Sequence, residues 1–262
     1  MKLKRVYNFN IKKVVRFFFK KQEKRYHSAF TLAEVLLTLV LVGVVAALTL
    51  PTLITNCQKI ISKNKVKKAY ALLSQTTRMA ENDYGNVSTW QLPEGDSWQN
   101  AKTFTDTYIS PYLKVSHSCK QRNNEKNCDY NMYGLNGTAY RNIYKDKTYR
   151  FYMVDGTFVM VWAFYRPNYS GHKKRASIFF DIDGPRGANT VGKDIFKLEY
   201  IIESTTKEAS KIGKILPAWI DEDRARLMSN RNEMCNTRQD GIACLALIYK
   251  DGWDIASDYP WK

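Results

Sequence analysis

The sequence predicts an α+β fold in which one long amino-terminal helix packs on an antiparallel β-sheet domain. Two observations predict the helix. Residues 30–50 form an apolar run with one charged residue, Glu34, and the helical period continues beyond it to about Tyr84. The third observation is a series of runs rich in Val, Ile, Phe and Tyr that begins near Thr148. We therefore expect a basic leader over 1–29, the helix over 30–84 and one α+β domain over 85–262.

The leader carries most of the excess positive charge. Residues 1–29 contain ten Lys or Arg residues and one acidic residue, Glu23, which gives +9 of the net charge of +16. The rest of the chain has 31 basic and 24 acidic residues, so it is only weakly basic, at +7. Because basic residues beside an apolar segment hold that end in the cytoplasm, we interpret the leader as a cytoplasmic anchor rather than a nucleic-acid-binding arm.

Residues 30–50 are long enough and apolar enough to cross a membrane. A helix of this length matches a hydrocarbon core of about 30 Å, and a core helix of a soluble protein is rarely apolar on every face. An ordinary secretory signal is an alternative, since Val44-Val45-Ala46 offers small residues to a signal peptidase, but Glu34 and the long polar leader disfavour it. A carboxylate in lipid costs about a few kcal/mol, so Glu34 is expected to have a partner.

Beyond Pro51 the helix is expected to become amphipathic. Pro51 removes one backbone hydrogen bond and should bend the helix, and Asn82-Asp83-Tyr84-Gly85 should end it. Basic residues between Lys59 and Lys68 favour a solvated or lipid-headgroup surface over a ligand site. The positions expected to face the domain recur at intervals of three and four: Val66, Ala69, Tyr70, Leu73, Thr76, Met79 and Ala80.

Residues 85–118 are expected to form loop structure, because Gly85, Pro93, Gly95 and Pro111 interrupt any period there. The aromatic side chains of this segment should pack on the core: Trp90, Trp98, Phe104, Tyr108 and Tyr112.

The sheet is expected to begin with a hairpin. Asp155-Gly156 favours a two-residue turn with positive φ angles between strands at 148–154 and 157–164. Two further strands are expected at 175–182 and 195–201, the second of which alternates apolar and charged residues. An antiparallel sheet packed against the long helix follows from these elements.

Four of the five cysteines form two pairs with equal spacing. Cys119 and Cys128 are nine residues apart, as are Cys235 and Cys244, which favours two local disulfides in an extracytoplasmic domain, although four cysteines allow three pairings. A zinc site is a weaker alternative because no Cys-x-x-Cys spacing is present. Cys57 is expected to be a free thiol.

An acidic, glycine-rich segment lies between the last two predicted strands. Its candidate oxygen ligands, Asp181, Asp183, Asn189 and Asp194, resemble those of a calcium loop, although the spacing differs from that of an EF-hand. A turn held by Asx hydrogen bonds is the alternative.

The start of the apolar run resembles the processing site of type IV prepilins and type II secretion pseudopilins. Ala29 followed by Phe30-Thr31-Leu32-Ala33-Glu34-Val35-Leu36 carries the resemblance, in register with the basic leader and the apolar helix. It implies a pilin-like fold, cleavage after Ala29 by a prepilin peptidase, N-methylation of Phe30, and Glu34 as the fifth mature residue. The family usually has Gly before the cut, and Ala29 is a small residue in its place. Pro51 stands where pilins often carry a helix-bending proline.

The resemblance also implies a location and an assembly mechanism. The chain would be a single-pass bacterial membrane protein with a cytoplasmic leader, an extracytoplasmic domain and a place in a type IV pilus or pseudopilus. Related loops occur in pseudopilin carboxy-terminal domains, which adds to the calcium hypothesis. Cleavage would create an α-amino group at Phe30, and a neighbouring subunit shifted along the axis could pair that amine with Glu34.

Three classes of function follow, and all share the anchor. The first is a structural subunit, whose partners are the prepilin peptidase and methyltransferase, other pilin or pseudopilin subunits, and membrane lipid. The second is a minor-pilin module that binds a surface, a secreted substrate or DNA. Scattered basic residues are usually solvated, so nucleic acid is the least favoured ligand. The basic candidates are Lys173, Lys174, Arg175, Arg224, Arg226 and Arg231.

The third class is a membrane-tethered extracytoplasmic enzyme, which would require a pocket with convergent titratable groups. The three histidines, His27, His117 and His172, form no recognisable pattern with a nucleophile. No phosphate loop or dinucleotide-binding motif is present in the sequence. We therefore expect a protein that is not an enzyme.

Overall fold

The structure is a computed structural model that describes residues 31–120, 128, 130–140, 146–187, 189–204 and 211–261. Its first element, helix α2, spans Leu32–Tyr84 and contains 53 residues, or about 80 Å at the standard helical rise. The prediction of one helix from Thr31 to Tyr84 is confirmed to within a residue. The chain divides into two compact units, Met1–Leu53 and Ile54–Lys262, so α2 contributes to both.

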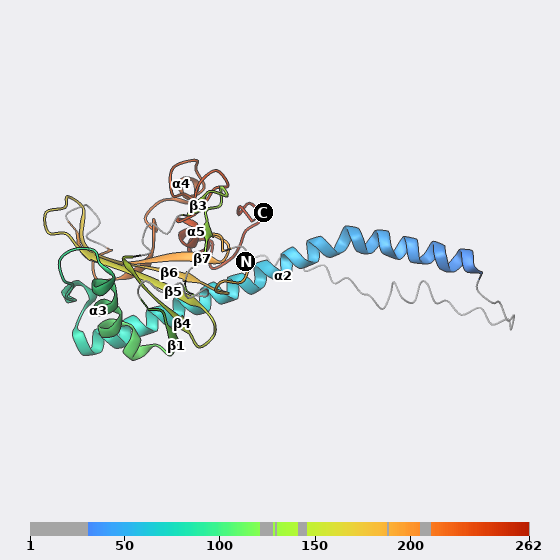
Figure 1. Cartoon of the computed structure of the whole chain (residues 1–262). Coiled ribbons are helices and arrows are strands. Elements are labelled where there is room, and N and C mark those ends of the chain that lie inside the picture. Colours follow the sequence, from blue (N-terminus) through green and yellow to red (C-terminus); the bar gives the residue numbers. More distant parts are fainter. Residues whose placement is uncertain are drawn as a thin grey trace, which may run out of the picture. The chain divides into compact units, whose positions relative to one another are not determined.

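A six-stranded antiparallel sheet forms the centre of the second unit (Figure 1), with strand order β1-β4-β5-β6-β7-β8. The predicted strands are present as β4 (Thr148–Met153), β5 (Phe158–Tyr165), β6 (His172–Asp181) and β7 (Ile195–Ser204). Two short edge strands, β1 (Val115–Ser118) and β8 (Ile215–Pro217), were not predicted. A separate pair consists of β2 (Met132–Tyr133) and β3 (Ala139–Tyr140).

The prediction of loop structure over 85–118 is wrong, because this segment contains helix α3, Trp98–Tyr108. Ser97 caps the helix by accepting a hydrogen bond from the backbone of Asn100. The helix buries Ala101, Phe104 and Tyr108, which lie on one face at helical spacing. A helical period is therefore present in this segment, although the glycine and proline residues around it made it hard to recognise. The other short helices are η1 (Val87–Thr89), η2 (Ser110–Tyr112), α4 (Arg224–Leu227) and α5 (Cys244–Lys250).

The prediction of a two-residue turn at Asp155-Gly156 is also wrong. The backbone of Met153 pairs with Thr157, which leaves three residues in the loop, and only Gly156 has a positive φ, 88°. Asp155 keeps a negative φ, and its carboxylate accepts hydrogen bonds from the backbone of Thr157 and from Lys68 of α2. A turn followed by a left-handed glycine is the usual form of a three-residue hairpin loop.

One face of the sheet packs against α2, α3 and α5 to form the main core. The α2 residues predicted to face the domain are buried at Val66, Ala69, Leu73, Thr76 and Ala80. Met79 does not follow this prediction, since its side chain is 41% exposed. Thr77 is buried instead, and its hydroxyl lies 2.7 Å from the Tyr200 hydroxyl on β7.

The aromatic side chains of 85–118 pack on this core as predicted. Trp90 and Phe104 are almost fully buried, and Trp90 stacks on Tyr108 with a ring-centroid distance of 4.3 Å. A smaller cluster on the opposite face of the sheet includes Phe158, Phe179 and the Cys119–Cys128 pair. The sheet is therefore covered on both faces within the second unit.

Candidate functional site

Glu34 lies in the first turn of α2, where it forms a capping box with Thr31. The Glu34 carboxylate accepts hydrogen bonds from the backbone nitrogen and the hydroxyl of Thr31, at 3.0 and 2.9 Å, and Thr31 Oγ1 accepts one from the backbone of Glu34. The Thr-x-x-Glu spacing is visible in the sequence, so this local partner could have been predicted. Ala29 and Phe30 lie outside the described residues.

The apolar half of α2 is exposed on every face. Between Thr31 and Leu53 only Ala46 is partly covered, and the most apolar window of the helix has no buried residue. Its length and composition suffice to cross a membrane. Pro51 lies inside the helix, close to the boundary between the two units.

Both predicted cysteine pairs are disulfides in the structure. Cys119 bonds to Cys128 and Cys235 to Cys244, with Cα–Cα distances of 6.0 and 4.6 Å, and Cys57 is a free, exposed thiol. Beside the first disulfide, the guanidinium of the buried Arg150 donates a hydrogen bond to the carbonyl of Cys128 at 2.7 Å. The second disulfide connects the segment after α4 to the start of α5.

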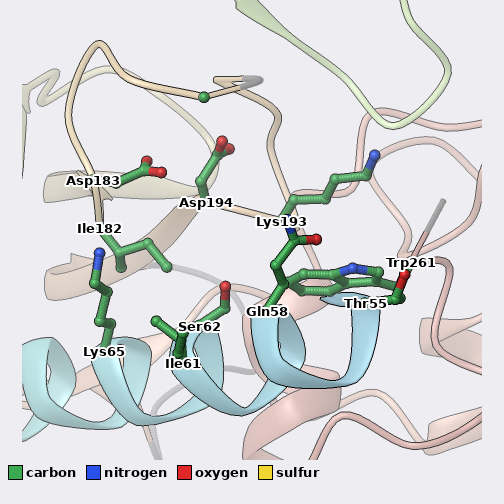
Figure 2. Close-up of a pocket in the computed structure, with 11 residues that line it drawn as sticks. Thr55, Gln58, Ile61, Ser62, Lys65, Ile182, Asp183, Lys193, Asp194 and Trp261 are labelled. Carbon is green, nitrogen blue, oxygen red and sulfur yellow. The ribbon is translucent and has the colours of Figure 1, made fainter. Parts of the chain in front are cut away.

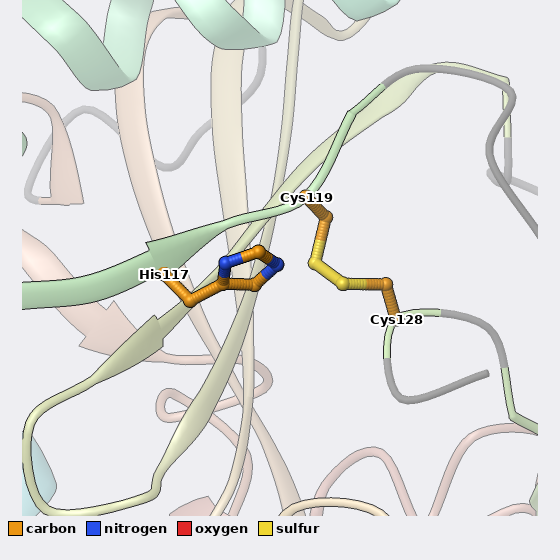
Figure 3. A group of neighbouring side chains, drawn as sticks. All are labelled: His117, Cys119 and Cys128. Atoms are coloured by element: carbon orange, nitrogen blue, oxygen red, sulfur yellow. A yellow bond between two sulfur atoms is a disulfide. The ribbon is translucent and has the colours of Figure 1, made fainter. Parts of the chain in front are cut away.

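His117 lies beside the first disulfide (Figure 3). Among the described residues, one group of three potential metal ligands has its ligand atoms within 4.8 Å of one another, and it consists of His117, Cys119 and Cys128. Because the two sulfur atoms are bonded to each other, neither is available as a thiolate ligand. This geometry disfavours the zinc alternative in the oxidised protein.

The acidic segment joins β6 to β7, and its first carboxylate is deeply buried. Asp181 has no exposed surface, and its carboxylate accepts hydrogen bonds from the Tyr130 hydroxyl at 2.7 Å and from the backbone of Asp183 at 3.2 Å. Burial, together with the nearby charge of Asp194, raises the pKa of Asp181 to about 9. The sequence contains no signal for Tyr130 as a partner, because it lies 51 residues from Asp181 in the chain.

Asp183 and Asp194 approach each other on either side of Gly187. A Cβ atom added to Gly187 would lie 3.0 Å from Oδ2 of Asp183 and 3.6 Å from Oδ2 of Asp194, and Gly187 has a φ of 94°. Burial and then the charge of Asp183 raise the pKa of Asp194 to about 6. The buried Oδ1 of Asp183 has no hydrogen-bond partner among the described residues, and a side-chain contact between Asp183 and Asp181 contributes to the raised pKa of Asp181. These two carboxylates are suited to a positively charged ligand.

The structure does not gather all four candidate calcium ligands. Asp183 and Asp194 face the same space, whereas Asp181 is engaged with Tyr130, and the three carboxylates have no set of oxygens within 4.8 Å of one another. Asn189 has a φ of 46°, and its buried Oδ1 has no hydrogen-bond partner among the described residues. Two carboxylates and an unpaired amide oxygen fit a hard cation, but they would need to move to surround one.

Asp183 and Asp194 line a pocket of about 470 Å³ beside α2 (Figure 2). Lys193 lies on the same loop, and the indole of Trp261 comes from the carboxy-terminal segment. The floor is formed by five residues of α2: Thr55, Gln58, Ile61, Ser62 and Lys65. The pocket therefore has carboxylates, ammonium groups, hydroxyls and one aromatic ring on its walls, but no histidine or cysteine among its lining residues.

Most of the basic residues proposed for a nucleic-acid surface are engaged with acids. Arg224 pairs with both Asp251 and Asp258, and Arg226 pairs with Glu222. Three more basic residues lie on β6: Lys173 lies 4.0 Å from Glu203, Arg175 lies 3.5 Å from Glu199, and Lys174 lies over the ring of Tyr165. These contacts disfavour a continuous phosphate-binding face.

A family model described as a family of unknown function, DUF6613, matches residues 52–262. The chain belongs to this family. The DUF6613 match begins within α2 and includes the sheet, both disulfides and the pocket, whereas Glu34 and the apolar half of the helix precede it. No curated protein and no solved structure matches the chain.

Proposed function

We propose that this chain is a prepilin-type structural subunit of a type IV pilus or a type II secretion pseudopilus. It is cleaved after Ala29, N-methylated at Phe30 and assembled through its apolar helix. The observation that carries the proposal is Glu34, a lone carboxylate at the entry of an apolar helix that is exposed on all faces. The order of one long helix followed by an antiparallel sheet supports a pilin-like fold.

The apolar half of α2 has two environments available to it. In the membrane its side chains contact lipid, and in a filament they contact the equivalent helices of neighbouring subunits. In the filament the Glu34 carboxylate pairs with the Phe30 amine of a neighbour, which fixes the axial register of the subunits. The 54–262 unit remains outside the apolar layer and is displayed on the surface.

The capping box gives Glu34 a second role that must be separated from the first. The Thr31 contacts require an acceptor at the Glu34 side chain but no charge, and glutamine supplies such an acceptor. Glu34→Gln therefore keeps the cap and removes the charge, whereas Glu34→Leu removes both. Comparison of the two variants isolates the ionic contribution.

The test is fractionation of cells that express each variant into membranes and sheared filaments. We expect Glu34→Gln and Glu34→Leu to be processed and retained in the membrane, but absent from filaments, because an unpaired amine in an apolar bundle costs about 3–5 kcal/mol. Val35→Leu is a matched control on the same turn and should assemble normally. Normal incorporation of Glu34→Gln would refute the ionic role of Glu34 in assembly.

A further inference from the structure

Strand geometry places His117 and Cys119 side by side (Figure 3). His117 is on β1, and Cys119 follows it by two positions, where its backbone nitrogen still donates to the carbonyl of Arg150 on β4 at 2.9 Å. Residues two apart in an extended strand point to the same face, so the imidazole and the Cys119 sulfur share one face of β1. Cys128 joins them through the disulfide, and the ligand atoms of the three residues lie within 4.8 Å of one another.

Arg150 holds the backbones of both cysteines without help from the disulfide bond. Its carbonyl accepts the hydrogen bond from Cys119, and its guanidinium donates to the carbonyl of Cys128 at 2.7 Å. The Arg150 side chain is buried, and a hydrogen bond from a charged group contributes about 1.5–3 kcal/mol. Both contacts are still available when the sulfur–sulfur bond is broken, so the two Cα atoms, 6.0 Å apart, should stay close in the reduced protein.

The dimensions of this group fit a tetrahedral zinc ion. Thiolate sulfur binds zinc at about 2.3 Å and imidazole nitrogen at about 2.0–2.1 Å, which separates neighbouring ligand atoms by about 3.5–3.8 Å. The 4.8 Å within which the three ligand atoms lie contains this range. After reduction the two sulfur atoms can separate to it by rotation of the cysteine side chains. Two thiolates and one imidazole are an established zinc ligand set that leaves the fourth position open.

We propose that His117, Cys119 and Cys128 form a redox-switched zinc site, which the disulfide closes and reduction opens. A dithiol reductant supplies two electrons and two protons: its own sulfur atoms become a disulfide, the Cys119–Cys128 bond breaks, and two thiols form. Zinc then displaces the two thiol protons, binds both thiolates and the imidazole, and keeps a water molecule as its fourth ligand. The metal thereby replaces the covalent link between the two cysteines.

The second disulfide provides an internal comparison. Cys235 and Cys244 are also nine residues apart and buried, but among the described residues they belong to no group of three potential metal ligands. Reduction of this pair should therefore create no zinc site of comparable affinity. The inference concerns the 54–262 unit alone, so it does not depend on processing at Phe30 or on assembly into a filament.

The experiment titrates cobalt, a spectroscopic substitute for zinc, into the full chain in detergent. The protein is used oxidised and after anaerobic reduction with a phosphine, which adds no competing thiol. We expect one cobalt per reduced chain, with thiolate-to-cobalt absorption that added zinc abolishes, and no such absorption in the oxidised protein. Replacement of both Cys119 and Cys128 by serine should abolish the site. The same replacement of Cys235 and Cys244 should preserve it.

His117→Gln tests the imidazole. It should weaken cobalt binding by at least about 10- to 100-fold, because loss of a group that merely supports a metal ligand already has an effect of this size. His172→Gln is the matched control on β6, a strand that does not neighbour β1 in the sheet, and it should bind cobalt as the wild type does.

Thermal unfolding gives a second readout that does not depend on absorption. Zinc should raise the unfolding midpoint of the reduced wild type, because a ligand of the folded state stabilises it, and should raise that of reduced His117→Gln much less. Equal cobalt affinity of the wild type and His117→Gln would overturn the inference. So would the absence of thiolate-to-cobalt absorption in the reduced wild type, a larger loss for the Cys235 and Cys244 pair than for the first pair, or a reduced chain that does not fold with zinc present.

Discussion

The two halves of α2 have the same backbone structure but opposite surroundings. From Thr31 to Leu53 nearly every side chain is exposed, whereas from Ile54 to Tyr84 a stripe that includes Val66, Leu73 and Ala80 is fully buried against the sheet. The second half is stabilised by packing, whereas the described residues bury almost none of the first half. Because so large an apolar surface is unfavourable in water, we propose that lipid or other subunits cover it.

The largest expected difference between the halves is their response to loss of a leucine side chain. Leu73→Ala should destabilise the 54–262 unit by about 2–5 kcal/mol, because it leaves a cavity in a fully buried site. Leu41→Ala, at a side chain that is 57% exposed, should change the same unfolding transition by less than about 0.5 kcal/mol.

The measurement is thermal unfolding of the full chain in detergent, followed by tryptophan fluorescence. All six tryptophans lie between residues 90 and 261, so the signal reports the second unit alone. Equal shifts for the two variants would mean that the halves are not energetically separate.

The disulfides provide a second test of whether the two halves are energetically separate, because both disulfides lie in the second unit. Replacement of Cys235 and Cys244 by alanine opens a loop of nine-residue separation, which costs about 2.5 kcal/mol in the chain-entropy model. The unfolding midpoint should fall, while membrane retention of the chain should not change. Loss of the protein from the membrane fraction would show that the anchor depends on the folded domain.

The buried acids predict an unusual pH dependence of the second unit. Because the folded protein raises the pKa of Asp181 to about 9 and that of Asp194 to about 6, it holds protons that the unfolded chain has lost. The contribution of these two groups to stability should be fully present below about pH 4, the pKa of an unfolded aspartate. It should be lost as pH rises from there to about 6 for Asp194 and about 9 for Asp181, by at most about 1.4 kcal/mol per pH unit for each proton.

Asp181→Asn keeps an acceptor for Tyr130 and removes the titration, so the fall between pH 6 and 9 should become shallower. The measurement is the unfolding midpoint across that range. An unchanged slope of the midpoint against pH would mean that a group other than Asp181 titrates in this range.

Of these changes, the addition of calcium should give the smallest change in the unfolding midpoint of the second unit. In detergent without phospholipid, calcium at sub-millimolar to millimolar concentration should raise the unfolding midpoint, because a ligand of the folded state stabilises it by mass action. Asp183→Asn should remove the shift. An identical midpoint in calcium and in chelator would favour the Asx-turn interpretation of the 181–194 segment.

Local patterns in the sequence predicted the elements that are defined by local chemistry. Helix α2, strands β4 to β7 and both disulfides follow from periodicity and spacing. Helix α3 was missed because nearby glycine and proline residues hid its Ser97 cap and apolar face. Thr77 was missed because Thr76 alone was assigned to the buried face, although Thr77 follows Leu73 by four positions. The pocket could not be predicted, since Gln58, Asp183 and Trp261 come from three distant segments that only the fold brings together.

In the function that we propose, the mature chain begins at a processed and methylated Phe30. Mass spectrometry of the amino-terminal peptide of the protein, purified from its own membrane, tests it most directly. We expect a mature chain that begins at N-methylated Phe30 and lacks the 29 leader residues. An amino terminus near Ala47, or an intact leader in the mature pool, would contradict it.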